Sequence, residues 1–268
     1  MVTSILQLPP ISVDETLTAP PGRVDLWCFF YEEIKDSGLT DQYYMLMTPE
    51  EQARHNRFYF ARDRLLFLAT RALIRTVLSC YADVAPEIWR FSEQERGKPF
   101  IKSPTVLPAL HFNLSNTYGL VVCAVSVTHA VLGVDAEFID RPGETMSIAD
   151  QYFSPQETRS LRALPPSAQR ERFFSYWTLK ESYIKARGLG LAIPLEQFSF
   201  LLDNRPEIGV VFHPPLRDDP SRWRFSLLRA SPHHLVAVGV DSAGATLSLR
   251  ACSFVPLRGV VPIRKEGP

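Results

Sequence analysis

Hydrophobic positions along the chain alternate between strand-like runs and helix-like stripes. Short, nearly continuous apolar runs predict strands at 24–30, 120–127, 131–135, 198–202, 210–212, 223–228 and 235–240. Between these runs, apolar residues recur at helical spacing over 49–81, as one helix or two, and over 167–187. This order predicts an α+β fold in which the runs at 120–127 and 131–135 are adjacent strands.

The predicted helices have recognisable ends. Thr48 followed by Pro49 provides an N-cap with proline at the first helical position, and Ser154 with Glu157 three residues later is a capping box. The last long helix is expected to stop at Gly188, because glycine favours the left-handed conformation that ends many helices.

Both ends of the chain are rich in proline and show no periodic pattern. Residues 1–21 are therefore predicted to form an irregular N-terminal arm, and residues 257–268 a C-terminal tail. A length of 268 residues allows one large domain or two small lobes. Because the helix-after-strand order of the first half repeats in the second, we assign an N-terminal lobe (22–129) and a C-terminal lobe (130–256).

Charge and composition exclude several classes of protein. Lys and Arg (29) balance Asp and Glu (29), so no overall field attracts nucleic acid or an anionic membrane. The longest uncharged stretch, 112–134, is interrupted by polar residues and is not expected to span a membrane. No secretory signal is visible, so the expected location is the cytoplasm. The cysteines have apolar or small neighbours and no metal-binding spacing, which predicts reduced, buried thiols at Cys28, Cys80, Cys123 and Cys252.

Two carboxylates follow an apolar run in the segment 133–137 (GVDAE). If the strand continues through them, Asp135 and Glu137 share one face, because residues two apart in a strand point the same way. Carboxylate oxygens at a strand end suit Mg²⁺, which prefers one or two carboxylates together with substrate phosphates and water. The alternative is a polar strand exit, because a single Asp-x-Glu is common.

A second candidate site lies in the helical segment 177–185 (WTLKESYIK). Glu181 and Lys185 are four residues apart, the spacing of an ordinary helix-stabilising ion pair. Trp177 and Ile184 lie on the same face, so the charges are next to apolar surface, where they need partners. A bound ligand or metal ion would supply such partners.

Together the two segments resemble the 4′-phosphopantetheinyl transferase superfamily. The family pattern is a (V/I)G(V/I)D strand followed by a W-x-x-K-E-x-x-x-K helix, and 133–137 and 177–185 match these parts in order. Residues 97–99 (GKP), 112–115 (FNLS) and 188–191 (GLGL) match further family segments. The resemblance covers about 54–200, and the chain length points to the large, surfactin-synthetase-activating type.

The resemblance implies transfer of the 4′-phosphopantetheine arm of coenzyme A to a serine of an apo acyl or peptidyl carrier protein, with release of 3′,5′-ADP. The carriers would serve polyketide, nonribosomal peptide or fatty acid synthesis. Asp135, Glu137 and Glu181 would hold Mg²⁺ against the pyrophosphate, and Glu181 is also a candidate to accept the serine proton, directly or through a metal-bound water. Lys185 would contact a pyrophosphate oxygen and stabilise or protonate the leaving group. Lys180, about 100° from Glu181 around the helix, is expected on the nucleotide side or at the carrier surface, if it acts at all.

The resemblance also assigns the nucleotide end of coenzyme A to basic and polar residues of the first half. Six arginines against one acid lie between residues 54 and 75, a pattern that solvation of a helix face also explains. Arg54 would bind the 3′-phosphate, and the loop with Arg96 and Lys98 would line the nucleotide pocket. Asn113 and Ser115 would contact phosphate.

One position departs from the family pattern. Asn116 stands where the family usually has histidine, and its amide donates a hydrogen bond but carries no positive charge. Coenzyme A binding is then less sensitive to pH, or another cation such as Arg57 compensates.

The family fold has two similar α+β lobes related by a pseudo-twofold axis, with coenzyme A between them, and the large type is usually a monomer. A rival hypothesis is a coenzyme A or nucleotide binding module that has lost catalysis, against which the intact Asp135, Glu137, Glu181 and Lys185 count. A generic Mg²⁺ phosphodiesterase is a third possibility, and it would release nucleotide without a carrier.

Overall fold

The computed structural model describes residues 3–4, 17, 19–34, 36–202 and 207–260. Contacts between residues divide the chain into two compact units. Unit 1 contains residues 3–4, 131–202 and 207–247, and unit 2 contains the described residues from 17 to 130 together with 248–260. Both units combine strands with helices, so the predicted mixture of α and β structure is confirmed. The pseudo-twofold relation stays a prediction.

The main sheet of unit 2 has the strand order β13-β12-β2-β6-β5. Its strands are β2 (Arg23–Phe29), β5 (His111–Thr117), β6 (Leu120–Ser126), β12 (Ser248–Val255) and β13 (Gly259–Val260). β6 pairs antiparallel with both β5 and β2, whereas β12 pairs in parallel with β2. A separate antiparallel hairpin consists of β3 (Arg90–Glu93) and β4 (Pro99–Ser103).

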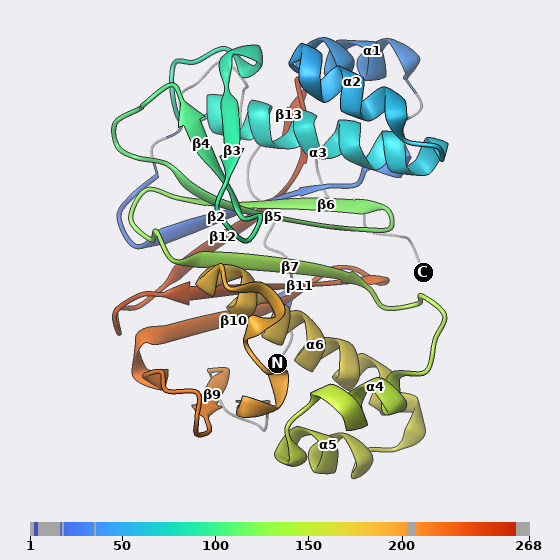
Figure 1. The fold of residues 1–268 in the computed structure, drawn as a ribbon, viewed down its shortest axis with the longest axis vertical. Coiled ribbons are helices and arrows are strands. Elements are labelled where there is room, and N and C mark those ends of the chain that lie inside the picture. The colour runs from blue at the N-terminus through green and yellow to red at the C-terminus, as the bar shows by residue number, and fades with distance from the viewer. Residues whose placement is uncertain (1–2, 5–16, 18, 35, 203–206, 261–268) are drawn as a thin grey trace. The chain divides into compact units, whose positions relative to one another are not determined.

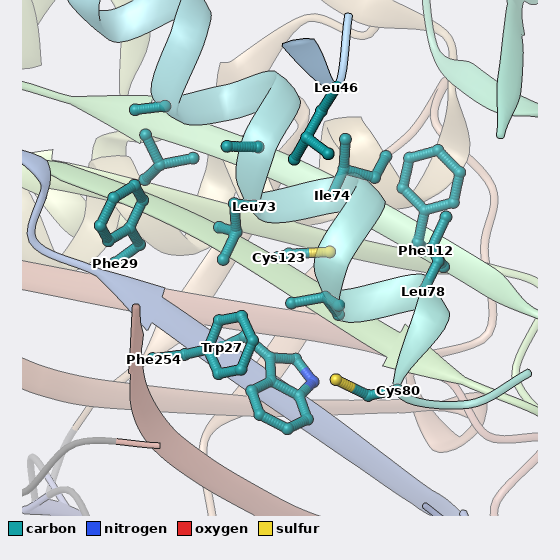
Figure 2. Packing of buried hydrophobic residues seen from close by; sticks show 14 of the residues in the cluster. Trp27, Phe29, Leu46, Leu73, Ile74, Leu78, Cys80, Phe112, Cys123 and Phe254 are labelled. Carbon is teal, nitrogen blue, oxygen red and sulfur yellow. The ribbon is translucent and has the colours of Figure 1, made fainter. Parts of the chain in front are cut away.

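The helices of unit 2 cover one face of this sheet (Figure 1). They are α1 (Ser37–Met45), α2 (Pro49–Arg57) and α3 (Ala61–Ser79), with 3-10 turns at Tyr31–Glu33 and Pro86–Ile88. Leu73 and Ile74 of α3 are fully buried and belong to the same core as Trp27, Phe112 and Phe254 (Figure 2). Each such buried aliphatic side chain contributes roughly 1.5–3 kcal/mol to folding, so the apolar stripe of α3 holds this helix on the sheet.

Unit 1 is built on a sheet with the strand order β1-β10-β11-β7. Its strands are β1 (Thr3–Ser4), β7 (Leu132–Phe138), β10 (Trp223–Ser231) and β11 (His234–Asp241), and a second small sheet contains β8 (Phe198–Leu201) and β9 (Gly209–Phe212). The long helix α6 (Pro166–Arg187) packs on β7 and β11. Unit 1 also contains α4 (Thr145–Tyr152), α5 (Pro155–Arg162) and 3-10 turns at Gly190–Ala192, Leu195–Gln197 and Pro220–Arg222.

The predicted helix ends are confirmed. Thr48 and Ser154 both form complete capping boxes, and Gly188 ends α6 in the left-handed conformation with φ of 64°. All four cysteines are free and buried, as expected. In the described part of the chain, no helix is both long enough and apolar enough to cross a bilayer.

The predicted pairing of two neighbouring strands is wrong. β7 does not pair with β6 but pairs antiparallel with β11, whereas β6 pairs with β2 and β5. The short link between them carries the chain from one unit to the other. Hydrophobic runs identify buried strands but not their partners, because pairing depends on contacts distant in sequence.

The chain ends also differ from the prediction. Thr3–Ser4, assigned to an irregular arm, pairs in parallel with β10, and Gly259–Val260, assigned to the tail, pairs with β12. The strand β12 itself was placed in the C-terminal lobe, but its parallel pairing with β2 puts it in unit 2. The other arm and tail residues lie outside the described ranges, apart from residues 17, 19–21 and 257–258.

Candidate active site on strand β7 and helix α6

Helix α6 lies very close to β7 because Gly133 has no side chain. A Cβ atom at Gly133 would be 2.1 Å from the carbonyl oxygen of Ser182 and 2.3 Å from the amide nitrogen of Ala186. Gly239 pairs with Gly133 across the sheet, and a Cβ there would be 2.7 Å from the Phe225 ring. Two adjacent glycines therefore provide the flat surface on which this part of α6 packs.

The close contact brings together the acidic residues of β7 and the lysine of α6. β7 continues to Phe138, so Asp135 and Glu137 lie on the same strand face as Gly133, toward the helix. Lys185 reaches this face from α6, with its Nζ 2.6 Å from Asp135 Oδ1. The Asp135 side chain is 7% exposed, whereas that of Lys185 is 29% exposed. The Lys185 side chain thus remains partly exposed while its ammonium group neutralises a buried carboxylate.

Glu137 is held by two further side chains. Arg141 Nη1 lies 3.1 Å from Glu137 Oε2, and the Trp177 side chain hydrogen-bonds to the same carboxylate. Arg141 also stacks on Phe174, with its guanidinium carbon 5.1 Å from the ring centroid. These contacts orient the Glu137 carboxylate from the segment after β7 and from helix α6.

The carboxylates of this site influence one another electrostatically. Burial, followed by repulsion from Asp135, raises the pKa of Glu137 to about 7, against the opposing effects of Arg141 and Lys185. Burial and Asp135 also raise the pKa of Glu181, while Lys185 acts in the opposite direction. Asp135 therefore lies near both glutamates. Carboxylates held close together bind protons or a cation more readily than isolated carboxylates do.

The donor chemistry of Asp135, Glu137 and Glu181 fits a hard divalent cation, because all three side chains offer carboxylate oxygens and a cation would offset the repulsion of Asp135 on both glutamates. Among the described residues, however, no three or more Asp, Glu, His or Cys side chains are grouped so that they could hold a metal ion. Lys185 instead contacts Asp135 directly. The magnesium site therefore stays a prediction.

The expected location of Lys180 is wrong. Lys180 lies neither toward a nucleotide nor at a surface, because its side chain is 0% exposed and its Nζ lies 2.8 Å from Oε2 of the equally buried Glu157. Its ammonium group also donates to the carbonyl oxygens of Leu195 and Phe198. Successive residues of a helix are rotated by about 100°. Lys180 therefore points into the interior of unit 1, whereas Glu181 points toward Asp135 on β7.

In unit 2, Arg54 is exposed near the C-terminal end of α2. Its guanidinium carbon lies 5.4 Å from the centroid of the Phe67 ring on α3. Arg57, the residue expected to compensate for Asn116, is exposed on the same helix end. Cations at the last turn of a helix are stabilised by its dipole, so these arginines stabilise α2 and are available to an anion.

Arg96 and Lys98 lie in the turn of the β3–β4 hairpin. Gly97 adopts φ of 82°, which favours glycine, and the Gln94 amide donates to the Lys98 carbonyl over 2.9 Å to close the turn. Arg96 is exposed, whereas Lys98 is partly buried. Burial lowers the pKa of Lys98 to about 8, so the turn holds one permanent cation and one whose charge is lost in mild alkali.

The three polar residues of β5 that were assigned to coenzyme A binding do not share one face of the strand. Asn113 and Ser115 are buried and, being two residues apart, lie on the same face of the strand, whereas Asn116 is exposed on the opposite face. The structure therefore keeps Asn113 and Ser115 together but does not place Asn116 on their face. Arg54, Arg96, Lys98 and these three residues all belong to unit 2.

Sequence reasoning missed the contacts of three residues around the site. Arg141 and Trp177 both hold Glu137, and Glu157 holds Lys180. The positions of Trp177, one helical turn before Glu181, and of Arg141, four residues after Glu137, were signals that could have revealed the first two. Glu157 was recognised only as part of a capping box, and nothing in the local sequence pairs it with Lys180.

Comparison with known proteins adds a family to this geometry. Residues 131–239 match the family model described as the 4′-phosphopantetheinyl transferase superfamily. Residues 39–128 match the model described as the N-terminal part of 4′-phosphopantetheinyl transferases. The two matches fall on unit 1 and unit 2, respectively.

Individual relatives agree with these matches. The chain is 37% identical to 4′-phosphopantetheinyl transferase HetI of Nostoc over 69% of its length and 77% of HetI. It is 32% identical to 4′-phosphopantetheinyl transferase Sfp of Bacillus subtilis over 74% of its length and 84% of Sfp. Among solved structures, holo-[acyl-carrier-protein] synthase of Thermotoga maritima aligns with a TM-score of 0.35 and 22% identity, over 42% of this chain and 62% of that one.

Proposed function

Because the chain belongs to the 4′-phosphopantetheinyl transferase superfamily, we propose that it transfers the 4′-phosphopantetheine arm of coenzyme A to a serine of apo acyl or peptidyl carrier proteins. The second product is 3′,5′-ADP, and the carriers would serve polyketide, nonribosomal peptide or fatty acid synthesis. The observation that carries the proposal is the meeting of Asp135, Glu137 and Lys185 where α6 packs on Gly133. A monomeric, cytoplasmic enzyme is part of the proposal.

In the proposed reaction, the serine oxygen forms a bond to the phosphorus that bears the pantetheine, and the bond from that phosphorus to the bridging pyrophosphate oxygen breaks. The serine proton goes to a base, and 3′,5′-ADP leaves with the electron pair of the broken bond. Negative charge grows on the leaving phosphate during this step. The protein therefore needs one proton acceptor and at least one cation near the pyrophosphate.

We assign the proton acceptor to Glu181. Burial and the nearby Asp135 raise the pKa of Glu181 above its usual value, which makes its carboxylate a better base at neutral pH. We assign the cation to Lys185, whose side chain is partly exposed and whose Nζ is held 2.6 Å from Asp135 Oδ1. On helix α6 these residues are separated by one turn, so both can face the same pyrophosphate.

Asp135, Glu137 and Glu181 are the residues that would hold Mg²⁺. When bound there, the ion would neutralise charge on the pyrophosphate oxygens. The fit rests on the closeness of Asp135 to both glutamates: burial, and after it repulsion from Asp135, raises the pKa of Glu137 to about 7 and raises that of Glu181 in the same direction. Lys185 offsets part of this repulsion through its contact with Asp135.

For the nucleotide end of coenzyme A we propose residues of unit 2. Arg54 would bind the 3′-phosphate, and the turn with Arg96 and Lys98 would contact the nucleotide, because these residues supply positive charge on α2 and on the β3–β4 hairpin. Asn113 and Ser115 would donate hydrogen bonds to phosphate from one face of β5. Asn116 is exposed on the other face of β5, so it would contact coenzyme A only from that face.

The proposal is tested by incubating the protein with Mg²⁺, coenzyme A and a purified apo carrier. Appearance of 3′,5′-ADP together with a carrier made heavier by phosphopantetheine supports it. Nucleotide release without any carrier would identify a phosphodiesterase instead, and coenzyme A binding without product would identify a binding module. A carrier with its acceptor serine changed to alanine is the control and should remain unmodified.

A further inference from the structure

Lys180 and Glu157 form a fully buried ion pair one residue away from the proposed catalytic Glu181. Lys180 Nζ lies 2.8 Å from Glu157 Oε2 and donates to the carbonyl oxygens of Leu195 at 2.7 Å and Phe198 at 2.6 Å. An ammonium group has three protons, so these three acceptors satisfy it completely. The Phe198 ring also lies with its centroid 4.2 Å from Nζ, within cation–π range.

Glu157 is satisfied just as completely and connects three elements. Its Oε2 accepts hydrogen bonds from the amide and hydroxyl of Ser154 at the start of α5, and from Lys180 of α6. Its Oε1 accepts from the amide of Phe200 on β8 over 2.9 Å. The Ser154 hydroxyl in turn accepts from Ser199 Oγ at 2.7 Å. The carboxylate thus ties α5, α6 and β8 together at one point.

Stability alone does not account for this pair. Burial lowers the pKa of Lys180, against the attraction of Glu157, which shows the cost of placing its charge in the interior. Well-packed apolar side chains of similar volume often stabilise a core as well as a buried ion pair or better. Apolar side chains lack direction. Lys180 of α6 makes three directed contacts, to Glu157, Leu195 and Phe198, and Glu157 is itself held by Ser154 and Phe200, so this network defines one orientation of α6.

The orientation of α6 matters because the proposed chemistry lies on its other side. At residues 182 and 186 the helix rests on the Gly133 surface, which sets its distance from β7. A flat contact of this kind does not by itself prevent rotation about the helix axis. Side-chain tips lie roughly 5–6 Å from the axis of a helix, so a rotation of about 10° moves them by roughly 1 Å. A displacement of this size is enough to disrupt catalysis.

We propose that Glu157 and Lys180 are positioning residues that fix the rotation of helix α6 and thereby place Glu181 and Lys185 against Asp135. The inference rests on the proposed function, because it assigns a catalytic consequence to the pair. Neither residue touches substrate. Lys180 acts through its neighbour Glu181 on the helix, and Glu157 acts through Lys180.

The test compares Lys180→Met, Glu157→Gln and a control variant, Val210→Ala, which opens a small cavity in the core of unit 1 on β9. Thermal unfolding of each is recorded, and carrier modification is assayed well below the lowest unfolding temperature. Lys180→Met and Glu157→Gln are expected to lower kcat by about 10- to 100-fold with less than about threefold change in the KM for coenzyme A. Val210→Ala is expected to lose stability while kcat stays within about twofold of the unchanged protein.

The inference is overturned if folded Lys180→Met or Glu157→Gln retains kcat within about twofold, or if kcat falls equally in Val210→Ala at the same loss of stability. Glu157→Gln keeps the shape of the side chain, so it provides the answer if Lys180→Met does not fold. Failure of the proposed function has a different outcome, because then the unchanged protein itself leaves the carrier unmodified.

Discussion

Gly133→Ala tests how the fold creates the site. The added Cβ would be 2.1 Å from the Ser182 carbonyl oxygen and 2.3 Å from the Ala186 amide nitrogen, and real Cβ contacts essentially never fall below 3.0 Å. Both neighbours are backbone atoms of α6 and cannot swing away. The helix must therefore move from β7 by about 0.9 Å or more at this point.

The consequence for activity follows from where this contact lies. Ser182 comes directly after Glu181, and Ala186 directly after Lys185, so both proposed reacting groups move with the displaced backbone. A misplacement of about 1 Å can reduce a rate by roughly 100-fold. Overpacking of this kind typically lowers the free energy of unfolding by about 1–3 kcal/mol. Many proteins remain folded after core changes that cost this much. We therefore expect a folded protein with kcat lower by roughly 100-fold.

The assay measures kcat for modification of an apo carrier, with circular dichroism and thermal unfolding recorded on the same samples. Gly209→Ala is the matched control, because its added Cβ would meet only the Leu201 side chain, at an ordinary contact distance of 3.4 Å. The control should keep full activity. If folded Gly133→Ala keeps kcat within about threefold, then the spacing of α6 and β7 does not set the geometry of catalysis.

Three further predictions concern single side chains. Glu181→Gln should abolish turnover but leave most of the affinity for coenzyme A, measured by calorimetry, because the nucleotide contacts lie elsewhere; full activity would remove Glu181 from the mechanism. Arg54→Ala should raise the KM for coenzyme A by about 10-fold, the effect of one lost charged contact, with little change in kcat; an unchanged KM would mean that the 3′-phosphate binds elsewhere. The pKa of Glu137 is raised to about 7 in the folded protein. The protonated carboxyl group therefore stabilises the fold fully below its unfolded pKa, and this stabilisation is lost as the pH rises through 7. Glu137→Gln should therefore raise the unfolding temperature in EDTA at pH 8 but not at pH 5, and a rise that is equal at both pH values would contradict the shifted pKa.

Much of the site could be predicted from the sequence because its signals are local. The strand periodicity placed Asp135 and Glu137 on one face, and the helix periodicity separated Lys180 from Glu181. The helix ends at Thr48 and Gly188 depend only on neighbouring residues, and they are confirmed. Local rules of this kind need no knowledge of the rest of the fold.

The remaining features depend on partners that are distant in sequence. Nothing near β7 indicates that it pairs with β11 rather than β6, and nothing near β12 indicates its pairing with β2. A buried ion pair between Glu157 and Lys180 looks, in sequence, like one capping residue and one surface lysine. Asn116 was grouped with Ser115 by resemblance, although adjacent residues of a strand point to opposite faces.

The most direct measurement for the proposed activity is the ratio of products in a single reaction. Intact-mass analysis of the carrier and chromatography of the nucleotides would be carried out on the same sample after incubation with the protein, Mg²⁺ and coenzyme A. We expect one 3′,5′-ADP for each phosphopantetheinylated carrier, and neither product with Glu181→Gln. An unmodified carrier, or nucleotide released without a matching gain in carrier mass, would contradict the transferase activity assigned to the site on β7 and α6.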